Sequence, residues 1–471
     1  MKTLYTINGF FELLTTSSQY KRQSTEEKKL LLFDRCNWFI TSVACINIQR
    51  EQPYEEFVNL HSSFLKRYLT NRNYKDIENC LLGLGILQIN NTYSTNRFSK
   101  SFRLTDKAVK LGIEDIDIKT EKFRRQYNRI NEERIREVLD NPLYKKIATN
   151  TAKLSVIEKQ DFLVDAYFDP FDYVKENEFD RMTDAEVEMF LDQLALKLSK
   201  DKNYINKKKR YEDFYKRFVN LNNVDDPKKL LEQYVNYLTS SAKSGRVYHT
   251  FAFMPRQVRK CLRTKTNNHI WEVDMSSAQP SIIFLEWLKW TKSNWSDTFQ
   301  DEYDLCLSLV LNGGIYKYVK ENSEYFSKIQ NYYNLKKEIL TIINAKNYRN
   351  DGNKALIELF PNVFNWINNI KDKEDYKKVS HIGQSAEANI FVEVYKKIPK
   401  DKFALIIHDC ILTTKRDVKL IKSLLEKRVR ELYPIVIRDK HSLDKLFKEE
   451  LVSIPDNELM ENKLIKFYNK I

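Results

Sequence analysis

Two stretches of the chain are apolar runs that end at a short polar turn, a pattern that predicts β-strands. In the first, residues 269–273 lead to Asp274, a small-residue turn follows, and Pro280 stands near the start of an apolar run that predicts a helix. We therefore expect Asp274 at a strand end, with its side chain facing a cleft. Capping of the following helix is the alternative role for this carboxylate.

The second stretch, residues 403–414, contains two apolar runs that meet at His408 and Asp409, which predicts a β-hairpin with Asp409 at its turn. A strand end and a hairpin tip can meet across one sheet. Asp274 and Asp409, with the backbone carbonyl of Met275, could then hold two Mg²⁺ ions, the arrangement that binds the attacking and leaving oxygens of a phosphoryl transfer. We expect a nucleotidyltransferase in which His408 braces the hairpin and contacts nucleic acid.

The helix predicted over residues 331–346 carries the side chains expected to bind a nucleotide. Lys336, Leu340 and Asn344 are four residues apart and so line one helix face. Lys336, with Lys337 beside it, would bind the triphosphate and neutralise charge on the leaving pyrophosphate, while Leu340 and Asn344 would meet the sugar or base. A lysine on a helix is usually only solvated, so this prediction depends on the two aspartates.

Three further helices are predicted in the C-terminal part of the chain. One opens at residue 380 and ends near residue 397, and it would direct Gln384 toward the cleft and nucleic acid. The segments 418–433 and 442–450 have the apolar spacing of amphipathic helices that pack behind the sheet.

The N-terminal pattern is helix, helix, strand, turn, strand, with helices expected at 55–69 and 74–84 and strands at 86–90 and 99–105. This order resembles a winged helix, and residues 1–115 are expected to form such a domain. Lys100 and Arg103 on the second strand, with Arg97 in the turn, would contact DNA phosphates. Protein contacts alone are the alternative use of such a domain.

Residues 116–240 are charged and helical in period, which suits a thumb-like region that grips a nucleic-acid backbone. A dense cationic segment follows and leads directly to Asp274. Its arginines, Arg246, Arg256 and Arg259, are expected to hold primer and template phosphates.

Composition supports a nucleic-acid partner and excludes several other classes. The chain has 471 residues, enough for two or three domains, and 79 Lys and Arg against 65 Asp and Glu give it a net charge of +14. Its six cysteines show no CxxC spacing, and it contains neither a P-loop nor a GxGxxG motif. No apolar run approaches membrane-spanning length and the N-terminus lacks a signal-peptide layout, so we expect a cytoplasmic protein that does not enter a membrane.

Five segments stand in the order found in family A DNA polymerases and the related single-subunit phage-type RNA polymerases, and the chain resembles these families over about residues 240–430. The segments are Gly245-Arg246, similar to a Thr-Gly-Arg segment; Val273–Ser276, similar to motif A; Lys336–Ala345, similar to motif B of the RNA polymerases; Gly383–Ala386, similar to a Gln-Gly-Ser-Ala palm segment; and Ile407–Asp409, similar to the Val-His-Asp of motif C.

The chain departs from these families in the number of acids, which is two as in the RNA polymerases, and at positions that bear on sugar choice. Cys410 stands where the DNA enzymes carry Glu, and Asn344 and Ala345 stand where Tyr and Gly are usual. The resemblance places Gln279 where the DNA enzymes use Glu to exclude a ribose hydroxyl, so Gln279 is expected to contact the nucleotide without a charge.

Together these features predict an α+β, mostly helical protein whose residues 241–471 form a polymerase palm with a small antiparallel sheet and short fingers at about 290–370. The expected activity is template-directed nucleotide transfer, as a DNA polymerase of a phage or mobile element that uses DNA, nucleoside triphosphates and two Mg²⁺ ions. An RNA polymerase, a primase-like enzyme or an untemplated polymerase is the first alternative. A non-catalytic DNA-binding replication initiator or regulator is the second.

Overall fold

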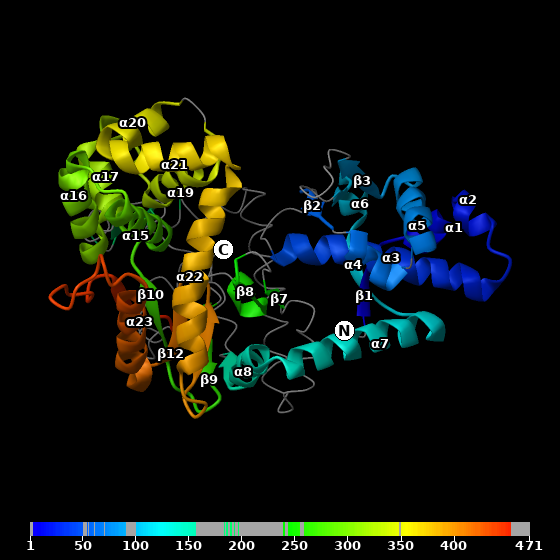
Figure 1. Cartoon of the computed structure of the whole chain (residues 1–471). Coiled ribbons are helices and arrows are strands. Elements are labelled where there is room, and N and C mark those ends of the chain that lie inside the picture. The colour runs from blue at the N-terminus through cyan, green and yellow to red at the C-terminus, as the bar shows by residue number, and fades with distance from the viewer. Residues whose placement is uncertain are drawn as a thin grey trace. The chain divides into compact units, whose positions relative to one another are not determined.

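A computed structural model of the chain describes residues 3–49, most of 54–90, 100–156, 239–240, 244–254, 259–347 and 350–453, with a few residues between 183 and 196. These residues are mostly helical with small antiparallel sheets, so the predicted α+β class is confirmed. They form two compact units (Figure 1). Residues 3–142 belong to the first unit, and residues 143–156 and 239–453 belong to the second.

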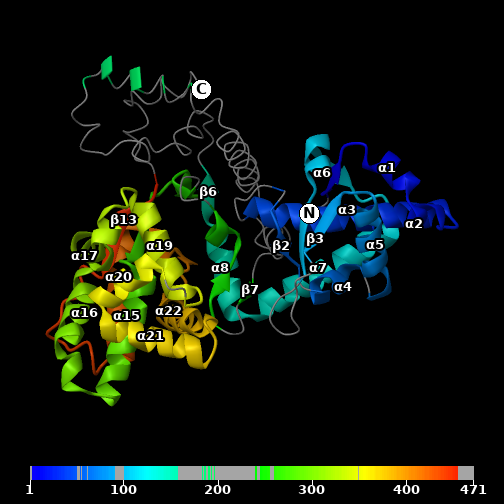
Figure 2. The ribbon, with the colours of Figure 1, turned by 90° about the horizontal axis from the view of Figure 1, so that it is seen from above.

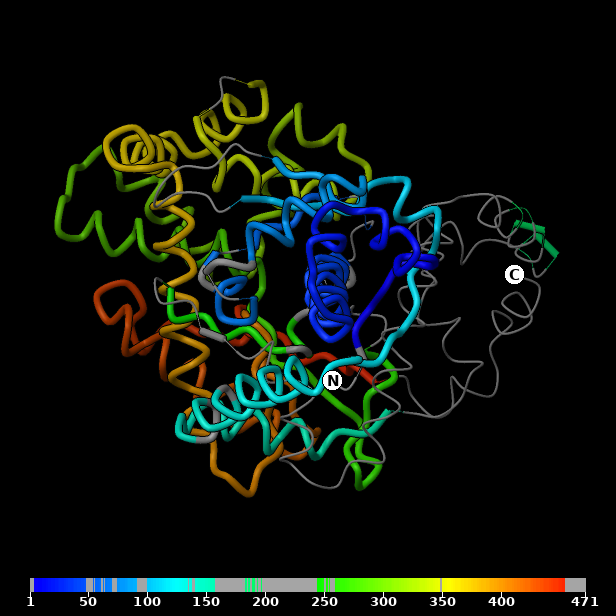
Figure 3. The backbone as a smooth tube through the Cα atoms, turned by 90° about the vertical axis from the view of Figure 1, so that its right-hand side faces the viewer, coloured from blue at the N-terminus to red at the C-terminus, as the bar shows by residue number. Residues whose placement is uncertain are grey.

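The first unit is built around the long helix α3 (Glu26–Gln49), which Figure 3 views nearly along its axis in dark blue. β1 (Thr3–Ile7) pairs antiparallel with β5 (Ile113–Asp117), so two distant parts of this unit meet in one small sheet. The other helices beside them are α1 (Phe10–Thr16), α2 (Ser18–Lys21), α6 (Asp106–Leu111) and α7 (Glu121–Asp140).

α7 packs within the first unit, although the sequence suggested that a separate helical region begins at residue 116. Its apolar residues Phe123, Tyr127 and Ile130 are buried in the core shared with α3. The remaining part of the predicted thumb, from residue 157 to 238, lies almost entirely outside the described residues.

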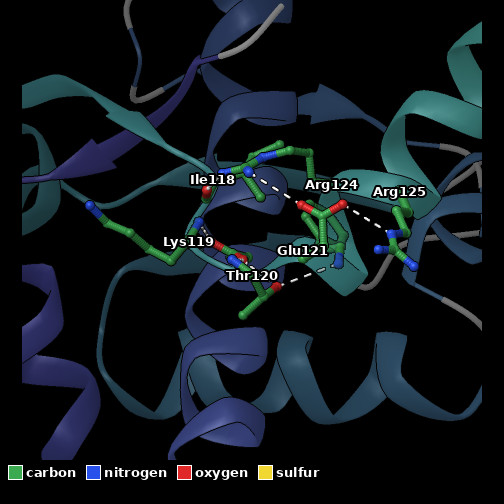
Figure 4. A network of polar contacts seen from close by, with 8 residues as sticks. Ile118, Lys119, Thr120, Glu121, Arg124 and Arg125 are labelled. Atoms are coloured by element: carbon green, nitrogen blue, oxygen red, sulfur yellow. Dashed lines mark hydrogen bonds and ion pairs between the residues drawn. The ribbon is translucent and has the colours of Figure 1, made fainter.

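Asp34 of α3 fixes the start of α7. Its buried carboxylate accepts hydrogen bonds from the backbone N–H and the hydroxyl of Thr120, at 2.7 and 2.6 Å. Burial raises the pKa of Asp34, although these hydrogen bonds act in the opposite direction. On the outer side of the same turn, Glu121 accepts hydrogen bonds from Arg124 and Arg125 (Figure 4), which stabilises the first turn of α7.

A three-stranded antiparallel sheet completes the first unit, with two helices between its first and second strands in the sequence. The elements are β2 (Val58–Asn59), α4 (Ser62–Leu69), α5 (Asn71–Gly83), β3 (Leu87–Asn90) and β4 (Ser101–Leu104), and the strand order is β2-β4-β3. The predicted helix, strand and return strand between residues 74 and 105 are confirmed. The helix expected from residue 55 is wrong at its start, because Val58 is buried in a strand and pairs with Phe102.

The second unit is organised on a four-stranded antiparallel sheet in the order β11 (Ala404–Ile407), β12 (Cys410–Thr414), β10 (Ile270–Met275), β13 (Phe447–Leu451). This confirms the strand predicted before the first aspartate and the hairpin predicted at the second. Ile407 pairs with Cys410, so the hairpin turn contains only His408 and Asp409.

Long helices cover this sheet. α22 (Lys377–Lys397) and α23 (Val418–Leu432) pack against each other and against its strands, and α15 (Ala278–Ser293), which follows β10, packs against α22 (Figure 1). Smaller elements of the unit are α8 (Pro142–Thr151), the pair β6 (Leu154–Val156) and β9 (Leu262–Thr264), and the pair β7 (Thr239–Ser240) and β8 (Val247–Tyr248).

The described residues of the region predicted as fingers form helices joined by short connections, without a strand. Its helices gather at one end of the sheet (Figure 1, Figure 2). They are α16 (Gln300–Asn312), α17 (Ile315–Asn322), α18 (Glu324–Ser327), α19 (Tyr332–Asn344), α20 (Asp351–Leu359) and α21 (Pro361–Lys373).

The helix predicted at 442–450 is wrong, because this segment contains the edge strand β13. Leu443, Leu446, Phe447 and Leu451 have helical spacing, which explains the prediction. In the structure Phe447 is buried and pairs with Met275, while the charged residues between Phe447 and Leu451 occupy an edge strand, where charge discourages pairing with other chains. Tertiary pairing with β10 therefore overrides the local period.

Among the described residues, no helix combines the length and the apolar character that crossing a bilayer requires.

Candidate active site

Asp274 near the end of β10 and Asp409 in the β11–β12 turn are brought together at one end of the sheet. Asp274 lies opposite Cys410 in the β10–β12 register, and the backbone N–H of Met275 donates a hydrogen bond to the carbonyl of Asp409 at 3.2 Å. Both aspartates are partly exposed. Two carboxylates from stretches 135 residues apart thus meet at one end of the sheet, as their strand-end positions predict.

The turns that carry these aspartates adopt uncommon backbone conformations. His408 has φ 48° and Ser277 has φ 50°, both in the left-handed region that non-glycine residues seldom occupy. Each such residue costs on the order of 1 kcal/mol and persists only where its surroundings hold it. Hydrogen bonds provide this restraint beside Ser277, because Ser276 donates from its N–H to Leu446 at 2.8 Å and from its hydroxyl to Lys445 at 3.0 Å.

Gly313 also restrains the turn after Asp274. It has φ 62° and follows α16, and a Cβ placed on it would lie 2.7 Å from the Cβ of Ser276 and 2.8 Å from the carbonyl oxygen of Lys445. The helical region is thus packed directly onto the turn that positions the first carboxylate, and only glycine fits at this contact.

Three cations act on the second carboxylate. Burial raises the pKa of Asp409, and the positive charges of Arg246, Arg259 and Lys336 oppose that shift. Arg246 precedes β8, Arg259 precedes β9, and Lys336 lies on α19. The structure therefore gathers around Asp409 three of the cations that the sequence assigned to substrate and nucleic acid.

Arg246 forms a buried ion pair with Glu387 of α22. Its side chain is 12% exposed, and that of Glu387 is 1% exposed. Burial raises the pKa of Glu387 to about 7, although the charge of Arg246 lowers it. Arg246 is thus an interior residue whose positive charge acts to lower the pKa of Asp409. Its contact with nucleic acid stays a prediction.

Two histidines contribute contacts at the hairpin, His249 from outside it and His408 from within its turn. The Nε2 of His249 lies 2.5 Å from the carbonyl oxygen of Ile406 on β11, and the ring of Tyr248 meets the ring of His408 edge-on at 5.5 Å. Burial lowers the pKa of both His249 and His408 to about 4, and the charge of Arg246 contributes at His408. Both rings are therefore neutral at pH 7, and His249 donates its Nε2 proton.

Lys336 lies between aromatic rings at the exposed surface of α19. Its Nζ is 4.8 Å from the ring centroid of Tyr332 and 5.6 Å from that of Tyr316. Burial raises the pKa of Tyr316, with the charge of Asp409 contributing, so this phenol also lies near the second carboxylate. Lys337, the neighbouring residue, is exposed.

Two residues that the sequence assigned separately to the nucleotide, Gln279 on α15 and Asn344 on α19, contact each other. Asn344 donates a hydrogen bond from Nδ2 to Gln279 Oε1 at 3.3 Å and another to the carbonyl oxygen of Leu340 at 2.9 Å. Both amide side chains are partly buried. Two of the positions at which the chain departs from the polymerase pattern therefore hydrogen-bond to each other.

Other predicted contact residues are occupied within their own units. Gln384 donates a hydrogen bond to the hydroxyl of Ser380 at 3.1 Å within α22. In the first unit, Lys100 pairs with Glu78 at 2.8 Å, and Arg103 donates to a glutamine on β3 at 2.8 Å. Arg256 lies outside the described residues, as does Arg97.

Four residues of the site were not predicted from the sequence: Glu387, Tyr316, His249 and Gly313. Glu387 carried a partial signal, because it is a charged residue that directly follows the predicted Gly383–Ala386 segment among small and apolar residues, whereas Tyr316 carried none. His249 and Gly313 act through contacts with residues far away in the sequence, which no local pattern reveals.

The donor atoms of the site fit Mg²⁺. Asp274 and Asp409 offer carboxylate oxygens, and the thiol of Cys410 beside them is buried with its pKa raised well above the usual value, so it stays protonated. No group of three or more His, Cys, Asp or Glu residues capable of holding a metal occurs in the part of the chain that the structure describes. Two carboxylates suit Mg²⁺, which keeps waters and substrate phosphates as its other ligands.

Comparison with models of known protein families gives no match to this chain, and comparison with curated proteins gives none either.

Proposed function

We propose that the second unit is a template-directed nucleotidyltransferase with a polymerase palm, and that it synthesises DNA. The observation that carries this proposal is that Asp274 near the end of β10 lies beside Asp409 in the β11–β12 turn, and that Lys336 acts electrostatically on Asp409. Two carboxylates and a nearby lysine are the protein groups that nucleotide transfer requires.

Each residue near the aspartates would have a distinct role. Asp274 and Asp409 would hold two Mg²⁺ ions, which when bound supply charge neutralisation at the reacting phosphate and activate the attacking hydroxyl. Lys336 would bind the β- and γ-phosphates and stabilise the leaving pyrophosphate. Arg246 and Arg259 favour the ionised form of Asp409, and Glu387 holds Arg246 in position.

The choice of sugar falls to the contact between Gln279 and Asn344. This amide pair blocks the space beside α15 without a charge, so it would exclude a ribose hydroxyl by its position alone. An RNA polymerase or primase-like activity uses the same palm chemistry, and a test with both types of nucleotide separates it from DNA synthesis.

The first unit would bind DNA as a winged helix. The order α4, α5, β3, β4, with β2 completing the sheet as β2-β4-β3, matches the arrangement expected for that domain. α5 would enter the major groove. Because Lys100 and Arg103 hold partners within the unit, they would have to exchange them for phosphates.

Extension of a labelled primer on a DNA template, with dNTPs or NTPs and Mg²⁺, tests the proposal. Asp274→Asn and Asp409→Asn should each abolish incorporation, whereas Asp351→Asn, which removes an acid that is 79% exposed on α20, should leave it intact. Incorporation that survives both site substitutions would refute the proposed chemistry. Incorporation limited to NTPs would assign RNA synthesis, and DNA binding without any incorporation would assign a non-catalytic regulator.

A further inference from the structure

A large cavity opens at the end of the sheet away from the two aspartates. It encloses about 1150 Å³ and is lined by the turn between β9 and β10, by residues that flank β11 and β12, and by the end of α8. This volume exceeds the roughly 300–1,000 Å³ of a typical small-molecule pocket, so the cavity can hold more than one nucleotide-sized group.

The lining of this cavity is cationic. Four basic side chains line it: Lys153, Lys265, Lys415 and Arg416. Its two acids are already engaged by cations, because Asp417 pairs with Lys402 at 3.1 Å and with Arg416 at 3.7 Å, and Asp401 pairs with Lys402 at 3.9 Å. The cavity therefore favours a polyanion.

A tryptophan supplies the second recognition element. Trp271 of β10 is partly exposed and lines the cavity, and the Nζ of Lys415 lies 5.5 Å from its ring centroid. Stacking of a base on an exposed aromatic ring is generally stronger than an exposed cation–π contact. A base could therefore displace Lys415 from the ring and leave its ammonium group to meet a phosphate.

This cavity is separate from the catalytic pair. Trp271 is three residues before Asp274 on the same strand, about 10 Å at the rise of a β-strand. Side chains alternate along a strand, so Trp271 and Asp274 point to opposite faces of the sheet. A ligand at Trp271 therefore need not occupy the nucleotide site.

We infer that this cavity binds a single-stranded nucleic-acid segment, with bases stacked on Trp271 and phosphates held by the surrounding lysines. The combination of positive charge and an aromatic ring is the one that single-strand binding uses. The choice of nucleic acid over another polyanion rests on the proposed function of the same unit. The segment would be strand outside the catalytic site, held without sequence reading.

Photo-crosslinking of the full chain to a single-stranded oligonucleotide that carries halogenated uracil locates the bound strand. Crosslinked peptides should contain Trp271 or the neighbouring turn at residues 265–268. Crosslinks confined to other peptides would overturn the inference. A free mononucleotide in excess should compete poorly; equal competition by mononucleotide would overturn the assignment to a strand.

Affinity measured by fluorescence anisotropy gives a second test. Trp271→Ala should weaken the binding of the oligonucleotide about tenfold, and Trp271→Phe should keep most of the affinity. Trp290→Ala removes a tryptophan that is 39% exposed elsewhere in the unit and should leave the affinity unchanged. Unchanged affinity in folded Trp271→Ala protein would overturn the inference.

Salt dependence measures the phosphate contacts. Joint replacement of Lys265 and Lys415 by alanine should reduce the slope of log affinity against log salt by roughly 1.4. Replacement of Lys317 and Lys328, which are 78% and 70% exposed, should leave the slope unchanged. Equal slopes in the two double variants would contradict phosphate binding in the cavity.

These measurements separate the cavity from the proposed chemistry. Asp274→Asn protein should lose incorporation and still crosslink at Trp271. Crosslinking at Trp271 in a protein that never incorporates nucleotides would leave the cavity assignment standing and remove the polymerase. Incorporation without crosslinking at the cavity would remove the cavity assignment and leave the polymerase proposal standing.

Discussion

Replacement of Gly313 by alanine would push directly on the turn that carries Asp274. The new Cβ would lie 2.7 Å from the Cβ of Ser276 and 2.8 Å from the carbonyl oxygen of Lys445. Neither atom belongs to the flexible end of a long side chain, so relief requires a shift of backbone. The residue would also have to keep φ 62°, which alanine disfavours.

The expected cost follows from these two effects. The left-handed backbone costs alanine about 1 kcal/mol, and overpacking of a close contact costs roughly 1–3 kcal/mol. The contact with Ser276 is roughly 0.8 Å short of ordinary carbon–carbon distance. Displacement of a catalytic group by about 1 Å can reduce the rate on the order of 100-fold. We therefore expect Gly313→Ala to lower the unfolding free energy by about 2–4 kcal/mol and incorporation by about two orders of magnitude.

Gly85→Ala is the matched control, because Gly85 has φ 68° but nothing lies within 4 Å of the position that a Cβ would take there. It should show the backbone cost alone, about 1 kcal/mol, without loss of incorporation. Urea unfolding of both variants gives the free energies, and primer extension under saturating nucleotide gives the rates. Differential scanning calorimetry assigns each loss to a unit.

Two results would refute this reasoning. If Gly313→Ala lowers the unfolding free energy no more than Gly85→Ala does, the contact with Ser276 is not as close as the structure places it. If Gly313→Ala is destabilised as expected but incorporates nucleotides at the normal rate, the turn after Asp274 does not position a catalytic group.

Three other perturbations test separate parts of the site. Arg246→Met leaves Glu387 buried without its partner and should lower the unfolding free energy in urea by about 3–5 kcal/mol. Glu387→Gln removes the buried charge and keeps a hydrogen-bond acceptor, so it should lower the unfolding free energy by less. A larger loss in Glu387→Gln than in Arg246→Met would contradict a buried ion pair. The pKa of His249 is lowered to about 4, so the stability that its neutral ring contributes is present above pH 6.5 and is lost as the pH falls toward 4. Over that range the unfolding free energy of the wild type should fall by about 1.4 kcal/mol per pH unit relative to that of His249→Gln. Parallel curves of unfolding free energy against pH would show that the ring is not buried in its neutral form. Lys336→Met should raise the KM for nucleotide and lower kcat in primer extension. Lys337→Met, at the exposed neighbouring residue, should change both constants less. Equal changes in the two variants would contradict the assigned role of Lys336.

The sequence predicts well those parts of the second unit in which chemistry and local structure coincide. Asp274 and Asp409 each end an apolar run, so one pattern gives both the strand and the position of its carboxylate. The spacing of Lys336 and Asn344 likewise puts both residues on one face of a predicted helix. In the structure Asn344 on that face donates a hydrogen bond to Gln279 of α15.

Prediction fails where the deciding contact is distant in sequence. The segment 442–450 has helical spacing, yet its charged residues carry a strand because the edge of β10 offers backbone hydrogen bonds to Phe447 and its neighbours. Val58 is a strand residue for the same reason, since its partner is Phe102. The spacing of apolar residues within a segment gives no information on whether a strand elsewhere in the chain has an unpaired edge.

Glu387 illustrates why electrostatic residues are the hardest to predict. On α22 it could as well have been a solvated helix residue, and only the fold brings Arg246 to it. The same arginine also acts on Asp409, which lies in a different element and much further along the chain. Arg246 therefore acts on two carboxyl groups at once: its charge lowers the pKa of both Glu387 and Asp409, against the larger effect of burial, which raises both.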